Sequence, residues 1–162
     1  MGTRAARSLY ILRLALSVLV CAHCFLPLTS QAEATKANCF DKAQTQVELN
    51  SCAGEEYAAA DVELNRVYQG VLARYKDDSK FIAKFRASQR AWLTYRDAEF
   101  EAKFPHADES KSTHFYGSIF PMCAAQYRAQ LTRARIARLR EWLDGTQEGD
   151  SCAGSVNFKS EP

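Results

Sequence analysis

One stretch of this 162-residue chain decides its fold: EEYAAADVELNRVYQGVLARY, residues 55–75. Its apolar side chains recur every three or four positions over about five turns, which is the spacing of one face of an α-helix. They are Tyr57, Ala60, Leu64, Val67, Val71, Leu72 and Tyr75. Such a stripe is stable only when other helices cover it, so the stretch predicts an amphipathic helix within an all-α protein.

The flanking segments have helical patterns of their own, and none shows the alternation typical of a β-strand. We expect a short helix at residues 41–53, the helix at 55–75, a third at 80–104 and a last one at 118–145. Ser79 is a suitable N-cap, and the third helix must end before Pro105. Pro121 is tolerated in the first turn of the last helix, which ends at Gly145. The sequence therefore predicts an all-α bundle of three to four helices, long and antiparallel.

The first 32 residues have the features of a secretory signal peptide. Arginines at positions 4, 7 and 13 precede an apolar run from Leu14 to Leu26, followed by Pro27 and small residues. Cleavage is expected after Ala32 or Ala34. The apolar run is too short to span a bilayer, which takes about 20 residues, so we expect no stable membrane anchor. The sequence predicts a periplasmic or secreted protein.

Removal of this signal peptide changes the charge balance. It takes away three arginines and no acid, so the net charge of +2 becomes about −1 in the mature chain. The basic pI of the precursor therefore gives no reason to expect nucleic acid as a partner. About 130 residues remain, enough for one helical domain at residues 33–145. Residues 146–162 form a polar C-terminal tail that we expect to be less ordered.

Four cysteines remain in the mature chain: Cys39, Cys52, Cys123 and Cys152. An even number in an exported protein is typical of disulfides, here two. A zinc site is the alternative, but the mature chain has no Cys-x-x-Cys or His-x-x-x-His pair. We therefore predict a disulfide-bonded domain without a metal site. Four cysteines allow three connectivities, and their spacing does not decide among them.

The segment QRAWLTYRD, residues 89–97, places polar side chains on an apolar helix stripe. Burying an amide and a guanidinium costs free energy unless both find hydrogen-bond partners, so the segment predicts a polar network between helices. The candidate members are Asp61, Asn65, Gln89, Trp92, Arg96 and Arg135. Such a network either fixes helix register or forms a ligand-binding or acid/base site. We favour the structural role, because nothing in the sequence indicates a substrate cleft.

Catalytic signatures are missing from the sequence. It has no Gly-x-Ser-x-Gly motif, and the mature chain keeps only His106 and His114, both in a connecting segment. We predict no catalytic residue and no cofactor. Residues 105–117 form a polar, irregular connection, which is either a flexible link or a partner-binding loop. The candidate binding residues are His106, Asp108, Glu109, Ser110, His114 and Tyr116.

One combination of residues resembles a known family. It includes two cysteines with twelve residues between them, at 39 and 52, the pair Leu64-Asn65, the segment Gln89-Arg90-Ala91-Trp92-Leu93, and Tyr95-Arg96-Asp97. Further along it includes Gly117-Ser118, Cys123, Thr132, Arg135 and Leu139. The pattern resembles the LprI-type lysozyme inhibitor family over nearly all of residues 39–140.

The resemblance implies a function and a disulfide pattern. It implies an exported protein that binds and inhibits lysozyme, a cationic hydrolase with two catalytic carboxylates in its cleft. The alternative is a periplasmic adaptor or stress-related binding module without lysozyme activity. Family members have a late cysteine where this chain has Phe100, so the resemblance implies Cys39 with Cys52 and a replacement pair of Cys123 with Cys152. A helix of about 31 Å separates that second pair, so the bond is barely within reach.

Overall fold

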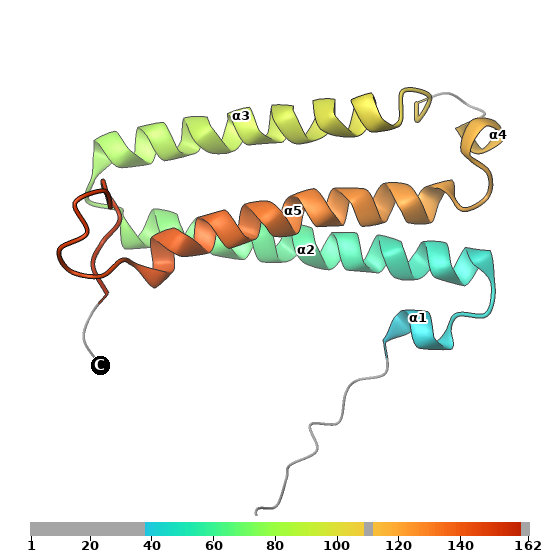
Figure 1. The fold of residues 1–162 in the computed structure, drawn as a ribbon, viewed down its shortest axis with the longest axis horizontal. Helices are drawn as coiled ribbons and strands as arrows, with labels where there is room; N and C mark the ends of the chain where they lie inside the picture. The colour runs from blue at the N-terminus through green and yellow to red at the C-terminus, as the bar shows by residue number, and fades with distance from the viewer. Residues whose placement is uncertain (1–37, 109–111, 160–162) are drawn as a thin grey trace, which may run out of the picture. The chain divides into compact units, whose positions relative to one another are not determined.

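Three long helices make up most of the chain. The computed structural model describes residues 38–108 and 112–159, so the expected signal peptide lies outside the described residues. The long helices are α2 (Gln46–Arg74), α3 (Ser79–Lys103) and α5 (Phe120–Asp144), and two short ones are α1 (Cys39–Lys42) and α4 (Ser112–Tyr116). Helix α3 runs antiparallel to α2 and α5, which share one direction (Figure 1). The prediction of an all-α bundle of long helices is confirmed.

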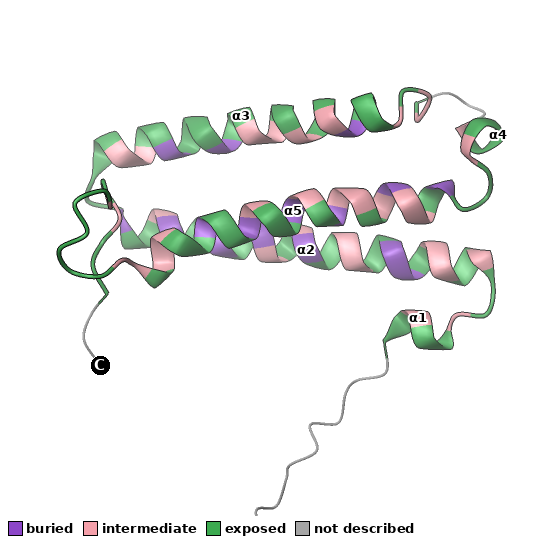
Figure 2. Ribbon diagram, viewed as in Figure 1, coloured by how far each residue is buried: buried purple, intermediate pink, exposed green. Residues whose placement is uncertain are grey.

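The parallel helices α2 and α5 pack closely along their whole length. The backbones of α2 and α5 lie close together over a much longer stretch than the backbone of either lies close to α3. Small buried residues permit this, because the distance between two helix axes depends on the side chains at the contact. They are Ala53 and Ala60 in α2 and Ala124, Ala129 and Thr132 in α5. Buried residues gather where these two helices face each other (Figure 2).

Helix α3 contacts this pair mainly through large aromatic side chains. Near one end of the bundle, Phe81 and Phe85 join a cluster in which Phe81 stacks on Tyr75 at 4.3 Å and Phe85 on Tyr68 at 5.4 Å. Near the other end, Phe100 packs with Phe120 in a second cluster. Aromatic pairs of this kind contribute about 0.5–1.5 kcal/mol each beyond the area that they bury. Large side chains therefore fill the space between α3 and the α2–α5 pair.

The start of α2 differs from the prediction. We expected separate helices at 41–53 and 55–75, but the structure has one continuous helix from Gln46 that passes through Gly54. The break comes earlier, because Thr45 forms a capping box: its Oγ1 accepts from the Glu48 amide at 3.3 Å, and Glu48 accepts from the Thr45 amide at 2.9 Å. The N-cap of α3 was also predicted wrongly, since Asp78 caps it in place of Ser79.

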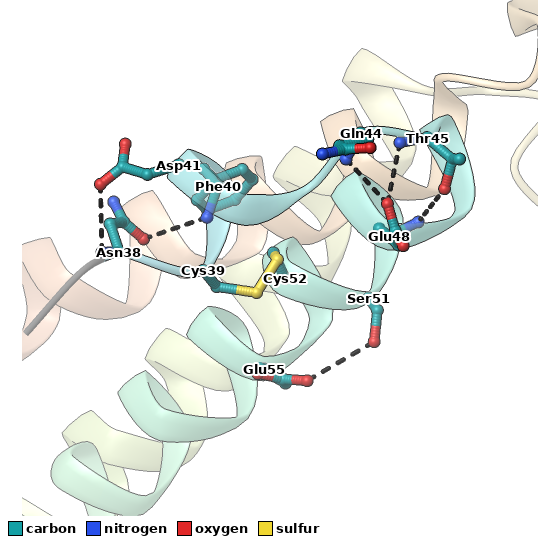
Figure 3. The surroundings of a disulfide bond; sticks show 10 residues. All are labelled: Asn38, Cys39, Phe40, Asp41, Gln44, Thr45, Glu48, Ser51, Cys52 and Glu55. Carbon is teal, nitrogen blue, oxygen red and sulfur yellow. Dashed lines mark hydrogen bonds between the residues drawn. A yellow bond between two sulfur atoms is a disulfide. The ribbon is translucent and has the colours of Figure 1, made fainter.

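The four-residue helix α1 is held against α2 by the Cys39–Cys52 disulfide, whose Cα atoms are 5.6 Å apart (Figure 3). This bond confirms the first predicted pair. The second pair was wrong, because Cys123 and Cys152 are both free thiols. Cys123 lies in the first turn of α5, whereas Cys152 lies beyond its other end (Figure 1). The tail does not return along the helix, so the two thiols stay far apart.

The polar tail folds back on the end of the bundle. Thr146 and Phe158 form an isolated β-bridge, in which the Thr146 amide donates to the Asn157 carbonyl at 3.0 Å. The Asn157 amide donates to the Tyr75 hydroxyl at 3.0 Å, and that hydroxyl donates to the Trp142 carbonyl at 3.2 Å. Residues 146–159 of the tail are therefore tied to the bundle by hydrogen bonds, where we expected a looser segment. Its last three residues lie outside the described ones.

Gly145 makes this return possible, and its replacement tests the tail's contribution. Its φ of 74° and ψ of 174° are accessible almost only to glycine, and a Cβ would lie 2.8 Å from the Asn157 carbonyl oxygen. We expect Gly145→Ala to lower the free energy of unfolding by about 1–3 kcal/mol in urea denaturation. The matched control is Gly54→Ala, whose Cβ meets nothing within 4 Å. This control should stabilise by about 0.5–1 kcal/mol. Equal effects of the two changes would contradict the structural argument.

Candidate functional site

The polar network that the sequence predicted begins between α3 and α5. Arg135 donates from Nε to the Gln89 Oε1 at 3.0 Å and from Nη2 to the Ser88 Oγ at 3.2 Å. Gln89 is only 8% exposed, so its carbonyl oxygen depends on this bond. Burial lowers the pKa of Arg135 from its usual value, but the guanidinium remains charged at neutral pH. One buried amide therefore holds α5 in register with α3.

The same network continues toward α2 through Trp92. The Trp92 ring centre lies 5.5 Å from the Arg96 guanidinium and 5.8 Å from that of Arg135. Arg96 in turn pairs with Asp97 at 2.9 Å and lies 3.9 Å from Asp61. The structure thus brings together every predicted member except Asn65, an exposed residue that lines a groove beside them. That the network serves mainly as a scaffold stays a prediction.

The connecting segment is more ordered than expected. We predicted an irregular stretch at 105–117, but residues 105–108 form a turn and residues 112–116 are helix α4. The His106 amide donates to the Tyr116 hydroxyl at 3.1 Å, and the His106 ring stacks on Phe115 at 4.2 Å. Tyr116 also stacks on Phe120, so this tyrosine anchors the segment to the bundle. Tyr116 is therefore half-buried, while Asp108 and His114 are exposed; Glu109 and Ser110 lie outside the described residues.

Apolar side chains that the sequence did not single out are exposed at this same end of the bundle. Phe115 is 56% exposed, Ile119 43% and Val47 77%. The Asn50 side-chain amide donates to the Ser118 carbonyl at 3.2 Å and so ties the start of α2 to the residue before Ile119. We call this end, made of residues 38–60, 92–108 and 112–131, the loop end (Figure 1). Exposed apolar residues with polar neighbours are typical of protein-binding surfaces.

Charge is unevenly divided between the two ends. The loop end has eight acidic and four basic side chains, whereas the opposite end, residues 61–91 and 132–159, has eight acidic and twelve basic. The acidic residues of the loop end are Asp41, Glu48, Glu55, Glu56, Asp97, Glu99, Glu101 and Asp108. The two ends thus have net charges of −4 and +4. Such a separation creates a field that steers charged partners toward one end.

A cleft of about 760 Å³ opens at the loop end, where α2, α3 and α5 meet the turn after α3. Asp97, Glu101 and Asp108 line it, together with the Arg128 guanidinium, which lies 3.4 Å from the centre of the Phe100 ring. Arg128 therefore covers an aromatic ring and neutralises part of the acidic lining. The cleft combines apolar walls with carboxylates, which suits the binding of cationic groups.

Neither a metal-binding group of side chains nor a membrane-spanning helix occurs in the part of the chain that the structure describes. In these ranges no group of three or more His, Cys, Asp or Glu side chains is placed to hold a metal ion. Of the helices at 38–108 and 112–159, none has both the length and the apolar character needed to cross a membrane. Fold and surface together define a small helical, disulfide-bonded protein with an acidic, partly apolar end.

Comparison with known proteins identifies the family. Residues 39–139 match the model of the family described as lysozyme inhibitor LprI, so this chain belongs to that family. An uncharacterised protein of Rhizobium meliloti (strain 1021) is 35% identical over 145 residues, which cover 82% of this chain and 95% of that protein. No solved structure matches the chain. The resemblance seen in the sequence is therefore confirmed, and the family is one of inhibitors.

The network between α3 and α5 can be tested by a double-mutant cycle. We expect Arg135→Met to lower the free energy of unfolding by about 1–3 kcal/mol, because it leaves the buried Gln89 amide without its partner. Combining Arg135→Met with Gln89→Leu should cost less than the sum of the two single changes, since neither polar group then remains unpaired. Urea denaturation measures all four proteins. Strictly additive losses would show that the two side chains do not interact.

Proposed function

We propose that the protein is exported and binds a lysozyme or a related peptidoglycan-cleaving hydrolase, which it thereby inhibits without catalysing a reaction itself. Membership of the LprI family over residues 39–139 is the observation that carries this proposal. The expected signal peptide supports export to the periplasm or beyond, where such a hydrolase acts. The disulfide between Cys39 and Cys52 suits the same oxidising location.

The loop end is the surface that best fits such a partner. Lysozyme is a cationic hydrolase, and this end has a net charge of −4. Opposite charges raise the rate of encounter and orient the two proteins before contact. The exposed Phe115, Ile119 and Val47 then provide apolar area for a close contact. An apolar centre surrounded by charged residues is the usual composition of a protein–protein interface.

The packing of the connecting segment refines which of its residues contact the partner. Tyr116 and His106 hold the segment in place through their mutual hydrogen bond and their ring contacts. We therefore assign the contact to the exposed Phe115 and Asp108 and regard Tyr116 as their support. A rigidly held segment loses less conformational entropy on binding than a mobile loop does, which favours affinity.

Charge reversal at the loop end tests the electrostatic part of the proposal. We expect Glu101→Lys combined with Asp108→Lys to raise the concentration of mature protein needed for half-inhibition of lysozyme roughly tenfold, because two attractive contacts become repulsive. The matched control is Asp77→Lys with Glu148→Lys, which makes the same charge change at the opposite end. That control should inhibit as the original protein does at equal salt. An equal loss in both variants would exclude the loop end as the specific surface.

The apolar part of the surface is tested by Phe115→Ala. Aromatic residues at the centre of an interface commonly contribute more than about 1 kcal/mol to binding, so we expect inhibition to weaken by about tenfold. Val62→Ala is the matched control, because Val62 is 70% exposed on α2 outside the loop end. Circular dichroism should show unchanged helix content in both. If the unaltered, oxidised protein inhibits no lysozyme at micromolar concentration, the family's activity does not extend to this chain, and an adaptor role becomes the better explanation.

A further inference from the structure

A second concave surface lies between α2 and α3, beside the polar network. This groove has a volume of about 450 Å³, within the range of small-molecule sites. Three arginines of α3 line it, Arg86, Arg90 and Arg96, and Asp61 and Asn65 of α2 lie across from them. We call it the arginine groove. Arg96 is the one residue that lines both this groove and the cleft at the loop end. The lining of the groove is mainly basic, whereas that of the cleft is mainly acidic.

Two of these arginines take part in no close ion pair among the residues that the structure describes. Arg86 and Arg90 are exposed and one helical turn apart, and no carboxylate of residues 38–108 or 112–159 forms an ion pair with either. Like charges at this spacing oppose helix formation slightly. Arg96, by contrast, pairs with Asp97 and lies near Asp61. Arg86 and Arg90 therefore have guanidinium groups that no close carboxylate of the described residues occupies, so both can bind an anion from outside.

The remaining lining is suited to a hydroxylated ring. Leu93 provides apolar surface beside the buried Leu64, and Tyr68 is an aromatic residue with a polar tip. Asn65 offers an amide that both donates and accepts hydrogen bonds, and Asp61 a carboxylate that accepts them. Asp61 would repel a bare anion at its end of the groove. A ligand that fits this lining has its charge at one end and hydroxyl groups at the other.

We propose that the arginine groove binds an anionic sugar. Arg86 and Arg90 hold its carboxylate or phosphate, because guanidinium groups bind both by paired, charge-assisted hydrogen bonds. Asp61 and Asn65 bind its hydroxyl groups, and the ring lies against Leu93 and Tyr68. The groove shares Leu93 and Arg96 with the loop end, but Arg86, Arg90, Asp61 and Asn65 lie outside it, so these four can be changed without altering the proposed inhibitory surface.

Titration of the mature, oxidised protein with small sugars tests the site. Chemical shifts of backbone amides are followed by two-dimensional NMR at constant ionic strength while glucuronate, glucose 6-phosphate or glucose is added. We expect saturable shifts at residues 61–68 and 86–96 with at least one charged sugar and none with glucose. The stronger of the two charged sugars identifies carboxylate or phosphate as the natural group. Absence of saturable binding by both, or equal binding of glucose, would overturn the proposal.

Substitution of the two unpaired arginines completes the test. We expect Arg86→Gln combined with Arg90→Gln to weaken binding of the charged sugar by about tenfold or more, because two charge-assisted contacts are lost. The matched control, Arg74→Gln with Arg138→Gln, removes the same charge from other exposed positions and should bind normally. Equal weakening in both variants would show non-specific attraction and refute the site. The NMR spectrum reports folding in each case, and inhibition of lysozyme should be unchanged in the Arg86/Arg90 variant.

Discussion

The close contact between α2 and α5 is the constraint on which the rest of this structure depends. The two helices are parallel, so no short connection can join them, and the chain must first return along the full length of the bundle as α3. Parallel helix dipoles side by side repel, and the antiparallel α3 partly offsets this. Ion pairs also join the two helices, Glu56 with Arg133 and Glu63 with Arg140. Hydrogen bonds from Arg66 of α2 itself and then from Arg140 lower the pKa of Glu63 to about 2, so the pairing with Arg140 persists in mild acid.

Side-chain size then determines how α3 joins the pair. Because alanines occupy much of the α2–α5 contact, those two helices leave little room between them for anything else. The aromatic residues of α3 pack over the outer surface of this pair, in one cluster around Phe85 and another around Phe100. Between the two clusters lies the polar segment with Gln89 and Arg96. The arrangement leaves room along the edges of α3, where the cleft at the loop end and the arginine groove lie.

The sequence predicted most helices well, because their ends depend on local chemistry. Pro105 and Gly145 correctly marked the ends of α3 and α5. The break at Thr45 was missed, although Thr45 and Glu48 have the spacing of a capping box, and the predicted break between residues 53 and 55 does not occur. The sequence correctly predicted that Gln89 is a buried polar residue, because this follows from helix periodicity. The geometry of its bond to Arg135 also depends on the register of α3 against α5, which appears only in the folded chain. The charge separation could not be predicted, because residues 48–56 and 97–108 meet only in the folded chain.

Helix periodicity gives the residues of the segment 89–97 different surroundings. Successive residues of a helix point about 100° apart, so neighbours in sequence face different surroundings. Gln89 and Trp92 contact Arg135. Gln89 also borders the arginine groove together with the exposed Arg90, whereas Asp97 lines the cleft at the loop end. Arg96 lies between them and borders both. The contacts of Gln89 and Trp92 with Arg135 hold one side of this helix against the bundle, and they thereby also fix the position of the charged residues on its exposed edges.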